Sequence, residues 1–383
     1  MDRDRLIRQY FSMGLPYAEI QAMLAFENDI VISNRHLRRQ LKRLGLARRK
    51  RHADLADVVE FLEREIQSSG QCHGYRWMHL KCLQSGLNID KETIRIALSV
   101  LDPIGVAIRS RRRLYRRAYH ANGPNFIWHA DGYDKLKPFG IGINGCIDGF
   151  SRKLIWCEAY KTNNDPTVIA GYFIEAVDRR GGFPFLIRTD MGTENRTMEQ
   201  MQLFFHRNIP NSVGFIYGTS THNQRIEFFW GILRKECIQF WMNVFHHIKD
   251  DGYFTGDDID RNLMQFCFLR RVQDDIDHVA EQWNCHRIRP LRNNITVHGR
   301  PVMMYSCPEL YGTRDYLHRV EPLEVLVCRE ECTFKGEFPC DEDFFHLCCI
   351  LMEENNLQEP SSPFDAVTLY LNLRNILRLE LNG

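Results

Sequence analysis

Three acidic residues stand where a metal-dependent site is commonly built. Asp131 lies in an expected strand at 127–133, Asp190 directly follows an expected strand at 185–188, and Glu227 lies about one turn into an expected helix. Magnesium and manganese prefer carboxylate oxygens and keep open positions that a nucleic-acid phosphate can fill. These residue types therefore fit metal-assisted phosphoryl transfer, provided that the fold brings them together.

The spacing of the three carboxylates matters more than any one of them. Surface Asp and Glu are usually solvated, so a single acidic residue carries little information. Here 58 residues separate Asp131 from Asp190, and 36 separate Asp190 from Glu227. The set of three acidic residues indicates a metal site only if each residue lies on a strand or helix that brings it to the same point.

The elements around these residues indicate an α/β fold. Three short strands rich in β-branched and aromatic residues are expected at 127–133, 140–148 and 154–160, with connectors short enough for hairpins. The elements expected after them are a helix at 165–179, a strand at 185–188, a helix near 197–206, a strand at 213–217 and a long helix from about 223. This order predicts a mixed five-stranded sheet flanked by helices, as in an RNase H-like fold, with the first and fourth strands adjacent at its centre.

Four motifs carry a resemblance to a known family. They are Trp128-His129-Ala130-Asp131, Ile147-Asp148-Gly149-Phe150-Ser151-Arg152, Thr189-Asp190-Met191-Gly192-Thr193-Glu194-Asn195 and Asn223-Gln224-Arg225-Ile226-Glu227. Over roughly residues 120–245 they resemble the core motifs of the retroviral integrase and DDE transposase family. More specifically, the chain resembles integrase-core proteins that animals encode as ordinary genes and that derive from mobile elements.

The resemblance implies a role for each acidic residue. Asp131, Asp190 and Glu227 match the acidic positions of the family and would bind two Mg²⁺ or Mn²⁺ ions. One ion would activate water or a DNA 3′-hydroxyl, and the other would stabilise the leaving oxygen. No small-molecule cofactor is expected. The zinc-binding His/Cys module of retroviral integrases is not expected in this chain, so recognition of DNA ends would fall to its helix-turn-helix units.

Residues close to the triad have several interpretations. Gly192 is expected to adopt a positive φ after Asp190, although an ordinary turn glycine explains it equally well. Glu194 and Asn195 are expected to line the site. We interpret Asp148 as a structural residue at a strand end or turn, and not as a metal ligand.

The helix that carries Glu227 also holds basic residues. Arg225, Arg234 and Lys235 would contact phosphates, or else they form a solvated helix surface. His222 and Asn223 are expected either to cap this helix or to contact substrate.

The first 120 residues carry 23 Lys and Arg against 13 Asp and Glu, which favours a polyanionic partner such as DNA. Helices expected at 3–12, 17–24 and 34–44 have the rhythm of a helix-turn-helix, with Pro16 opening the second and Ser33 capping the third. An amphipathic helix with a solvated basic face is the alternative. The candidate DNA-binding residues on the third helix are Arg35, Arg38, Arg39, Lys42 and Arg43.

A second helical unit follows a basic linker at 48–51. Helices are expected at 54–67 and 74–86, and Asp90 is expected to cap a third. The Gly74-Tyr75-Arg76 segment resembles the helix-turn-helix that precedes the core of bacterial insertion-sequence transposases. The basic stretch after it is expected to lie along a phosphate backbone as a strand or arm, through Arg111, Arg112, Arg113, Arg116 and Arg117.

The sequence divides into four expected parts. These are a helix-turn-helix unit at 1–52, a second such unit with its basic arm at 53–120, the catalytic core with a helical extension at 121–305, and a small region of unknown role at 306–383. The core extension is read as helix at 257–286 and polar irregular chain at 290–301. In the last part, 323–327 is expected to be a strand and 364–379 a strand or a helix.

Cysteines and apolar runs limit the other possibilities. The spacing of Cys328, Cys332, Cys340, His346, Cys348 and Cys349 favours buried thiols over a structural zinc site. None of the thirteen cysteines forms a Cys-x2-Cys pair, and no run of 18 apolar residues occurs. We therefore expect an intracellular, soluble protein without a membrane partner, nuclear if its source is eukaryotic.

Three functions remain open at this point. The leading one is a DNA strand transferase that processes ends and joins them, working as a homo-oligomer because two DNA ends must be joined in concert. A catalytically silent DNA-binding protein of chromatin or gene regulation is the alternative. A nuclease without joining activity would use the same metals.

Overall fold

The computed structural model divides into two compact units. One contains residues 1–127, 148–153 and 280–316, and the other contains residues 128–147, 154–279 and 317–383. The residues that the structure describes are 2–47, 53–68, 70, 73–109, 121–210, 213–218, 223–290 and 297–382.

A mixed five-stranded sheet forms the centre of the second unit. Its strand order is β3-β2-β1-β5-β6, and β2 runs antiparallel to β3, whereas β5 runs parallel to both β1 and β6. The predicted RNase H-like sheet is therefore confirmed, including the central position of the first and fourth predicted strands. The bounds are β1 Trp128–Tyr133, β2 Gly142–Asp148, β3 Leu154–Tyr160, β5 Ile187–Thr189 and β6 Phe215–Tyr217.

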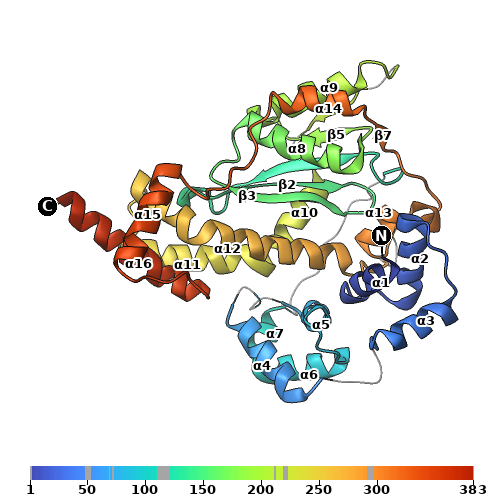
Figure 1. Cartoon of the computed structure of the whole chain (residues 1–383), viewed down its shortest axis with the longest axis horizontal. Coiled ribbons are helices and arrows are strands. Elements are labelled where there is room, and N and C mark those ends of the chain that lie inside the picture. Colours follow the sequence, from blue (N-terminus) through green and yellow to red (C-terminus); the bar gives the residue numbers. More distant parts are fainter. Residues whose placement is uncertain are drawn as a thin grey trace. The chain divides into compact units, whose positions relative to one another are not determined.

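Helices cover both faces of this sheet, as Figure 1 shows. On one face lie α8, α9 and α14, and on the other lie α10, α11 and α12. All seven residues of β2 are buried, which requires a covering layer on each side. The bounds are α8 Pro166–Arg180, α9 Arg196–His206, α10 Gln224–Leu233, α11 Gln239–Asp250, α12 Asp258–Cys285 and α14 Pro322–Arg329.

The ends of α8 illustrate how local sequence sets these elements. The Asp165 side chain accepts a hydrogen bond from the backbone N–H of Thr167 at 2.9 Å, and Pro166 occupies the first turn, where no N–H is needed. The helix ends at Gly181, whose φ of 65° lies in the left-handed region that glycine adopts without strain.

A π-helical turn joins α10 to α11. The sequence predicts one long helix from about 223, and the structure has helical backbone from Gln224 to Asp250 with the π turn at Arg234–Ile238. A π turn adds a residue to the helical repeat, so the side chains after it face a different direction from those of a continuous α-helix. The period of the apolar residues did not reveal it.

The last residues of the chain belong to the second unit. Strand β4 (Gly182–Phe183) pairs antiparallel with β7 (His318–Arg319), and helices α15 (Glu342–Glu354) and α16 (Pro363–Asn382) follow α14. The expected strand at 323–327 is wrong, because these residues lie within α14. A capping box between Glu321 and Glu324 starts that helix, and its buried residues, Val325 and Cys328, are three apart as on one helix face.

Helix α16 is held to the start of α12 by buried polar groups. Arg374 Nε donates to Asp260 Oδ1 at 2.8 Å, and the Asp260 side chain has no exposed surface. Tyr370 Oη also donates to the backbone carbonyl of Tyr253 at 2.8 Å. Burial alone would raise the pKa of Asp260, but hydrogen bonds from Arg374 and Thr255 hold it below the ordinary value.

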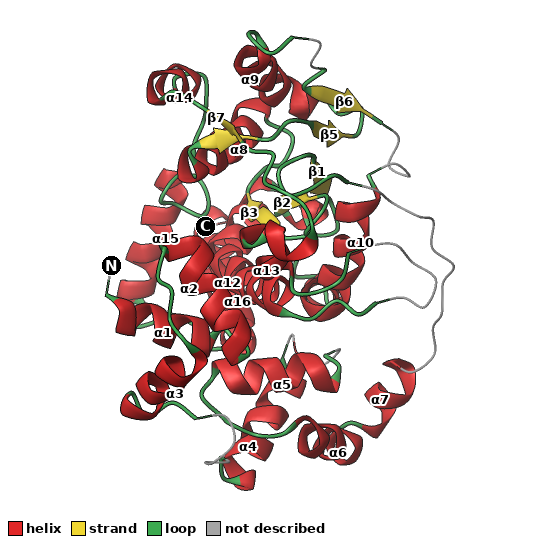
Figure 2. Cartoon of the chain, turned by 90° about the vertical axis from the view of Figure 1, so that its right-hand side faces the viewer, coloured by secondary structure: helices red, strands yellow, loops and turns green. Residues whose placement is uncertain are grey.

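The first unit contains two helical clusters (Figure 2). In one, α1, α2 and α3 share a core with α13, built from buried residues such as Leu6, Leu24 and Met303. In the other, α4, α5 and α6 pack around Val58, Met78 and Leu98. The bounds are α1 Arg3–Ser12, α2 Tyr17–Asn28, α3 Asn34–Arg43, α4 Leu55–Ile66, α5 Tyr75–Gln84, α6 Lys91–Leu101, α7 Pro103–Arg109 and α13 Pro301–Ser306.

The predicted helix starts in this unit are confirmed. Ser33, Asp54 and Asp90 each accept a hydrogen bond from the first turn of α3, α4 and α6. Helix α7 was not predicted, while the expected linker at 48–51 and arm residues 111–117 lie outside the described residues.

Short 3-10 turns complete the architecture at Lys137–Phe139, Thr193–Asn195 and Pro308–Tyr311. None of the helices in the described ranges combines the length and the apolar character needed to span a bilayer.

The ion pair between Arg374 and Asp260 provides a test of this packing. Arg374→Ala leaves a buried carboxylate with fewer partners, so we expect the free energy of unfolding to fall by about 2–4 kcal/mol. The matched control is Arg261→Ala, which removes an exposed partner 4.0 Å from Asp258 and should cost less than about 1 kcal/mol. Urea unfolding measures both, and equal losses would contradict a specific role for α16.

Candidate functional site

Parallel pairing of β1 with β5 brings two of the acidic residues together. Trp128 pairs with Ile187, and His129 with Arg188. Continuing this register by two residues sets Asp131 opposite Asp190, one residue beyond the end of β5. Paired residues on adjacent parallel strands point to the same face, about 4.8 Å apart along the hydrogen-bonding direction. The sequence predicted that these two strands are neighbours, and the observed register sets their two aspartates side by side.

Glu227 reaches the same region from α10. It lies in the first turn of that helix, which packs against β1, and its side chain is exposed. The amino end of a helix carries partial positive charge and favours a carboxylate there. Burial and the charge of Asp190 nevertheless raise the pKa of Glu227.

The three carboxylates influence one another electrostatically. Burial raises the pKa of Asp131 to about 7, and the charges of Asp190 and Glu227 add to the shift, while a hydrogen bond from Trp230 opposes it. A divalent cation would relieve this repulsion between like charges. The donor chemistry therefore fits a hard metal ion such as Mg²⁺ or Mn²⁺.

The carboxylates are near each other without forming a closed ligand group. Among the residues that the structure describes, no set of three or more His, Cys, Asp or Glu side chains lies close enough to hold a metal ion.

Trp230 is a neighbour of Asp131 that sequence reasoning missed. Its indole Nε1 donates to Asp131 Oδ2 at 2.9 Å, and its ring stacks on Tyr133 with centroids 5.0 Å apart. Trp230 lies three residues after Glu227 and so occupies a neighbouring position on the helix. That spacing was the only available signal in the sequence, and it is also typical of an ordinary core aromatic residue.

The turn after Asp190 differs from expectation in one respect. Gly192 has φ −98°, so the expected positive φ is wrong. A Cβ there would overlap the end of the flexible Glu194 side chain, which can move aside, so the other interpretation, an ordinary turn glycine, accounts for Gly192. Asn195 is buried, and its Nδ2 donates to Glu194 Oε1 at 3.0 Å and to Asp190 Oδ1 at 3.5 Å. Asn195 and Glu194 thus lie beside Asp190, as expected of residues that line the site.

Asn223 fastens the start of α10 to β1. Its Nδ2 donates to the carbonyl of Ala130 at 2.9 Å, and its Oδ1 lies 2.8 Å from Nδ1 of His129. Asn223 stands at the N-cap position of α10, as expected, but its side chain makes no capping hydrogen bond because these two contacts occupy the amide. Burial lowers the pKa of His129 to about 3, which keeps the imidazole neutral. His222 lies outside the described residues.

Asp148 is a structural residue, as interpreted from the sequence. It ends β2, has no exposed surface, and accepts hydrogen bonds from the backbone N–H groups of Asn125 and Ser151, each at 2.7 Å. The Ser151 hydroxyl adds a third at 2.7 Å. The two hydrogen bonds from Ser151 close the turn after β2, in which Arg152 adopts a φ of 64°.

The predicted phosphate-contacting residues lie on exposed helical surface. Arg234 and Lys235 are exposed in the π turn, where Arg234 Nε donates to Gln239 at 3.1 Å and Lys235 Nζ donates to Glu236 at 2.7 Å. Arg225 is partly buried in the first turn of α10, and its charge contributes to the lowered pKa of His129. On α3 the five predicted basic residues are all exposed.

The C-terminal cysteines behave as buried thiols. Cys328, Cys340 and Cys348 are buried, and Cys332 and Cys349 are partly buried. Burial raises the pKa of Cys348 to about 12, which keeps the thiol protonated. These cysteines lie at least 100 residues after Glu227 in the sequence, and their protonated thiols are not ligands of the kind that the three carboxylates provide.

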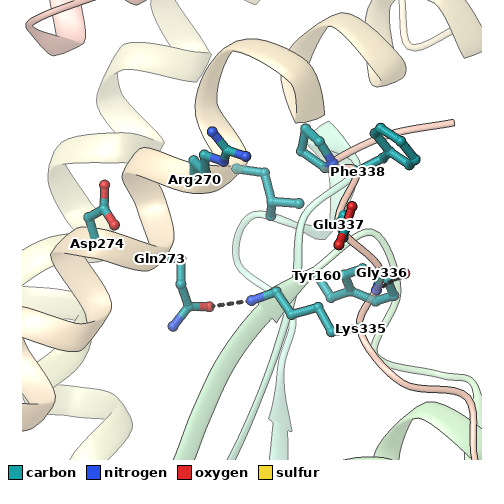
Figure 3. Close-up of a pocket in the computed structure, with 10 residues that line it drawn as sticks. Tyr160, Arg270, Gln273, Asp274, Lys335, Gly336, Glu337 and Phe338 are labelled. Atoms are coloured by element: carbon teal, nitrogen blue, oxygen red, sulfur yellow. Dashed lines mark hydrogen bonds between the residues drawn. The ribbon is translucent and has the colours of Figure 1, made fainter. Parts of the chain in front are cut away.

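A separate pocket of about 130 Å³ lies elsewhere in the second unit (Figure 3). Residues from β3, α12 and the segment 335–339 line it, and none of the acidic triad is among them. Lys335 Nζ bonds to Gln273 Oε1 and to Glu158 Oε2, each at 3.0 Å. These contacts tie the segment before α15 to the sheet, so the pocket reflects packing of the C-terminal part.

Sheet order, covering helices and acidic residues together define an RNase H-like domain with its carboxylates at the centre of the sheet. Residues 118–303 match the family model of the integrase core domain, so this part of the chain resembles that family. Its members are generally polynucleotidyl transferases that bind DNA and use divalent metals. None of the curated proteins compared with the chain matches it.

The pH dependence of stability tests the role of Asp148. Burial raises its pKa to about 6, from an ordinary value of 3.8. Because the folded value is the higher one, the contribution of Asp148 to stability is fully present below pH 4 and is lost as the pH rises through 6. At 1.36 kcal/mol per pKa unit this loss amounts to at most about 3 kcal/mol.

The Asn side chain of Asp148→Asn cannot ionise. Its amide N–H₂ group would also face an N–H or O–H donor that now bonds to the carboxylate, so one hydrogen bond would be lost. We expect this variant to be less stable than wild type, with a difference that is largest near pH 4 and shrinks towards pH 7. Chemical denaturation at several pH values measures this. A difference that stays constant from pH 4 to pH 7.5 would show that the carboxyl does not titrate as described.

Proposed function

We propose that the chain is a DNA polynucleotidyl transferase of the integrase and transposase type, which cleaves DNA ends and joins them to a target. One observation carries the proposal. Asp131 and Asp190 come from adjacent parallel strands and Glu227 from the helix packed on them, and the three charges act on one another. A structural ion pair would place an acidic side chain beside a basic one. Three acidic side chains together instead favour a cation-binding role.

Asp131, Asp190 and Glu227 would hold two Mg²⁺ or Mn²⁺ ions. When bound, such ions activate water or a 3′-hydroxyl as nucleophile and stabilise the leaving oxygen at phosphorus. The protein contributes the fixed strands that hold the two aspartates and an exposed carboxylate on α10. Arg225, Arg234 and Lys235 on the same helical segment would bind phosphates of the DNA.

The three helices α1 to α3 would act as a helix-turn-helix DNA-binding unit. Arg35, Arg38, Arg39 and Lys42 lie exposed on α3 while Leu37 and Leu41 face its core. This separation of basic and apolar faces supports contact with a phosphate backbone. Helix α6 of the second cluster carries fewer basic residues on its exposed side, so α3 is the stronger candidate for DNA recognition.

Two further properties follow from the proposed reaction. Joining two DNA ends in concert requires more than one active centre, so we expect a homo-oligomer. Action on chromosomal DNA also implies a nuclear location if the source is eukaryotic. An origin from a mobile element would account for such a domain in an ordinary gene.

A silent DNA-binding protein and a nuclease without joining activity remain the competing functions. They differ from the proposed one in their products, since incubation with Mg²⁺ and labelled duplex ends gives bound, nicked or joined DNA. Joined products support the proposal, nicked ends alone support the nuclease, and bound but unchanged DNA supports the silent protein.

Asp190→Asn tests the metal-binding role directly. The substitution removes one negative charge and keeps the size of the side chain, so we expect cleavage and joining to fall at least about 100-fold, an effect of roughly 3 kcal/mol on the barrier. DNA affinity should be nearly unchanged. Asp258→Asn, at an exposed position on α12, is the control and should retain activity. Joining by Asp190→Asn at the wild-type rate would refute the assignment.

The salt dependence of DNA binding tests the role of α3. Arg38→Ala with Lys42→Ala removes two exposed charges one turn apart, so the slope of log affinity against log salt should decrease by about two. The matched control is Lys91→Ala with Arg95→Ala, which are equally spaced and exposed on α6. Fluorescence anisotropy with a labelled duplex measures both. Equal slopes for the two pairs would contradict recognition by α3.

A further inference from the structure

An indole group contacts the most deeply buried carboxylate of the acidic triad. Trp230 Nε1 donates to Asp131 Oδ2 at 2.9 Å, and both residues are nearly excluded from solvent. The indole nitrogen is a donor only, so the direction of this hydrogen bond is unambiguous and Oδ2 must be the acceptor. The stacking of the ring on Tyr133, with 26° between the planes, restricts its rotation.

A glycine in β2, the strand next to β1, leaves room for this indole. A Cβ at Gly145 would lie 2.7 Å from Cη2 of Trp230, closer than non-bonded carbon atoms approach. Gly145 lies inside β2 and pairs with Cys157 of β3, a position where glycine weakens a strand unless another group needs the space. The site is therefore shaped from two directions, by a donor on α10 and by the missing side chain on β2.

We propose that Trp230 is a positioning residue that fixes the carboxylate of Asp131 for binding a divalent cation. The inference rests on the proposed role of Asp131 as a metal ligand. A neutral donor fixes one carboxylate oxygen and leaves the negative charge in place, whereas an Arg or Lys partner would neutralise the charge and compete with the cation. Partners of metal ligands typically contribute a factor of 10 to 100 in metal affinity.

The role is distinct from that of the other tryptophans in this unit. Trp241 Nε1 also donates to a carboxylate, Asp275 Oδ2, at 2.9 Å, and its side chain is equally buried. Asp275 is not one of the three acidic residues of the sheet. If both indole–carboxylate hydrogen bonds were purely structural, removing the one at Trp230 should affect metal binding as little as removing the one at Trp241.

Trp230→Phe removes the N–H and keeps an aromatic ring, and Trp241→Phe is its matched control. We expect calorimetric titration of the metal-free full chain with Mn²⁺ alone to give 10- to 100-fold weaker binding for Trp230→Phe and wild-type affinity for Trp241→Phe. Unfolding measurements on both variants show whether the losses of stability are comparable. Equal Mn²⁺ affinity in Trp230→Phe and Trp241→Phe would overturn the inference.

Asp190→Asn separates failure of the inference from failure of the proposed function. If Asp190→Asn weakens Mn²⁺ binding while Trp230→Phe does not, the metal site stands and Trp230 has no positioning role. If wild type binds no Mn²⁺, or Asp190→Asn binds it as wild type does, the proposed function fails and the inference fails with it.

Gly145→Ala tests the same geometry should Trp230→Phe not fold. It keeps both hydrogen-bonding groups and displaces the indole, so Mn²⁺ affinity should again fall. Gly231→Ala, beside Trp230 on the same helix and with open space around it, is the control and should bind Mn²⁺ as wild type does. Unchanged affinity in a folded Gly145→Ala variant would count against positioning by the indole.

Discussion

The parallel pairing of β1 with β5 is the constraint on which the candidate site depends. These strands are separated in sequence by a hairpin and by α8, so a crossover connection must form before Asp131 and Asp190 can meet. Once the register is set, both aspartates point to one face at the centre of the sheet. Burial is the main reason for the raised pKa of Asp131, and the charges of Asp190 and Glu227 add to it.

Other groups hold this arrangement without neutralising it. Asn223 ties α10 to β1, Asn195 donates to Asp190, and Trp230 donates to Asp131, and all three donors are uncharged. A neutral partner orients a carboxylate while preserving its charge. The basic residues of the helix, Arg234 and Lys235, bond instead to Gln239 and Glu236.

The sequence predicted the strands of the sheet and most helix starts, because each depends on local signals. Alternating apolar residues and side-chain caps such as Ser33 and Asp90 act over a few positions. The π turn at 234–238 and the contacts of Trp230 with Asp131 and Tyr133 were not predicted, because no short pattern in the sequence encodes them. Helix α14 was missed because Leu323, Val325 and Val327 alternate like a strand, although Pro322 and the Glu321 capping box start a helix.

The bond between Arg374 and Asp260 has a consequence for synthesis of the chain on the ribosome. The two residues are 114 positions apart, so at 5–20 residues per second Arg374 emerges roughly 6 to 23 s after Asp260. During that interval the start of α12 lacks the guanidinium that balances its buried carboxylate. The contact between α12 and α16 therefore forms after the whole five-stranded sheet has been synthesised, because all its strands precede Asp260 in the chain.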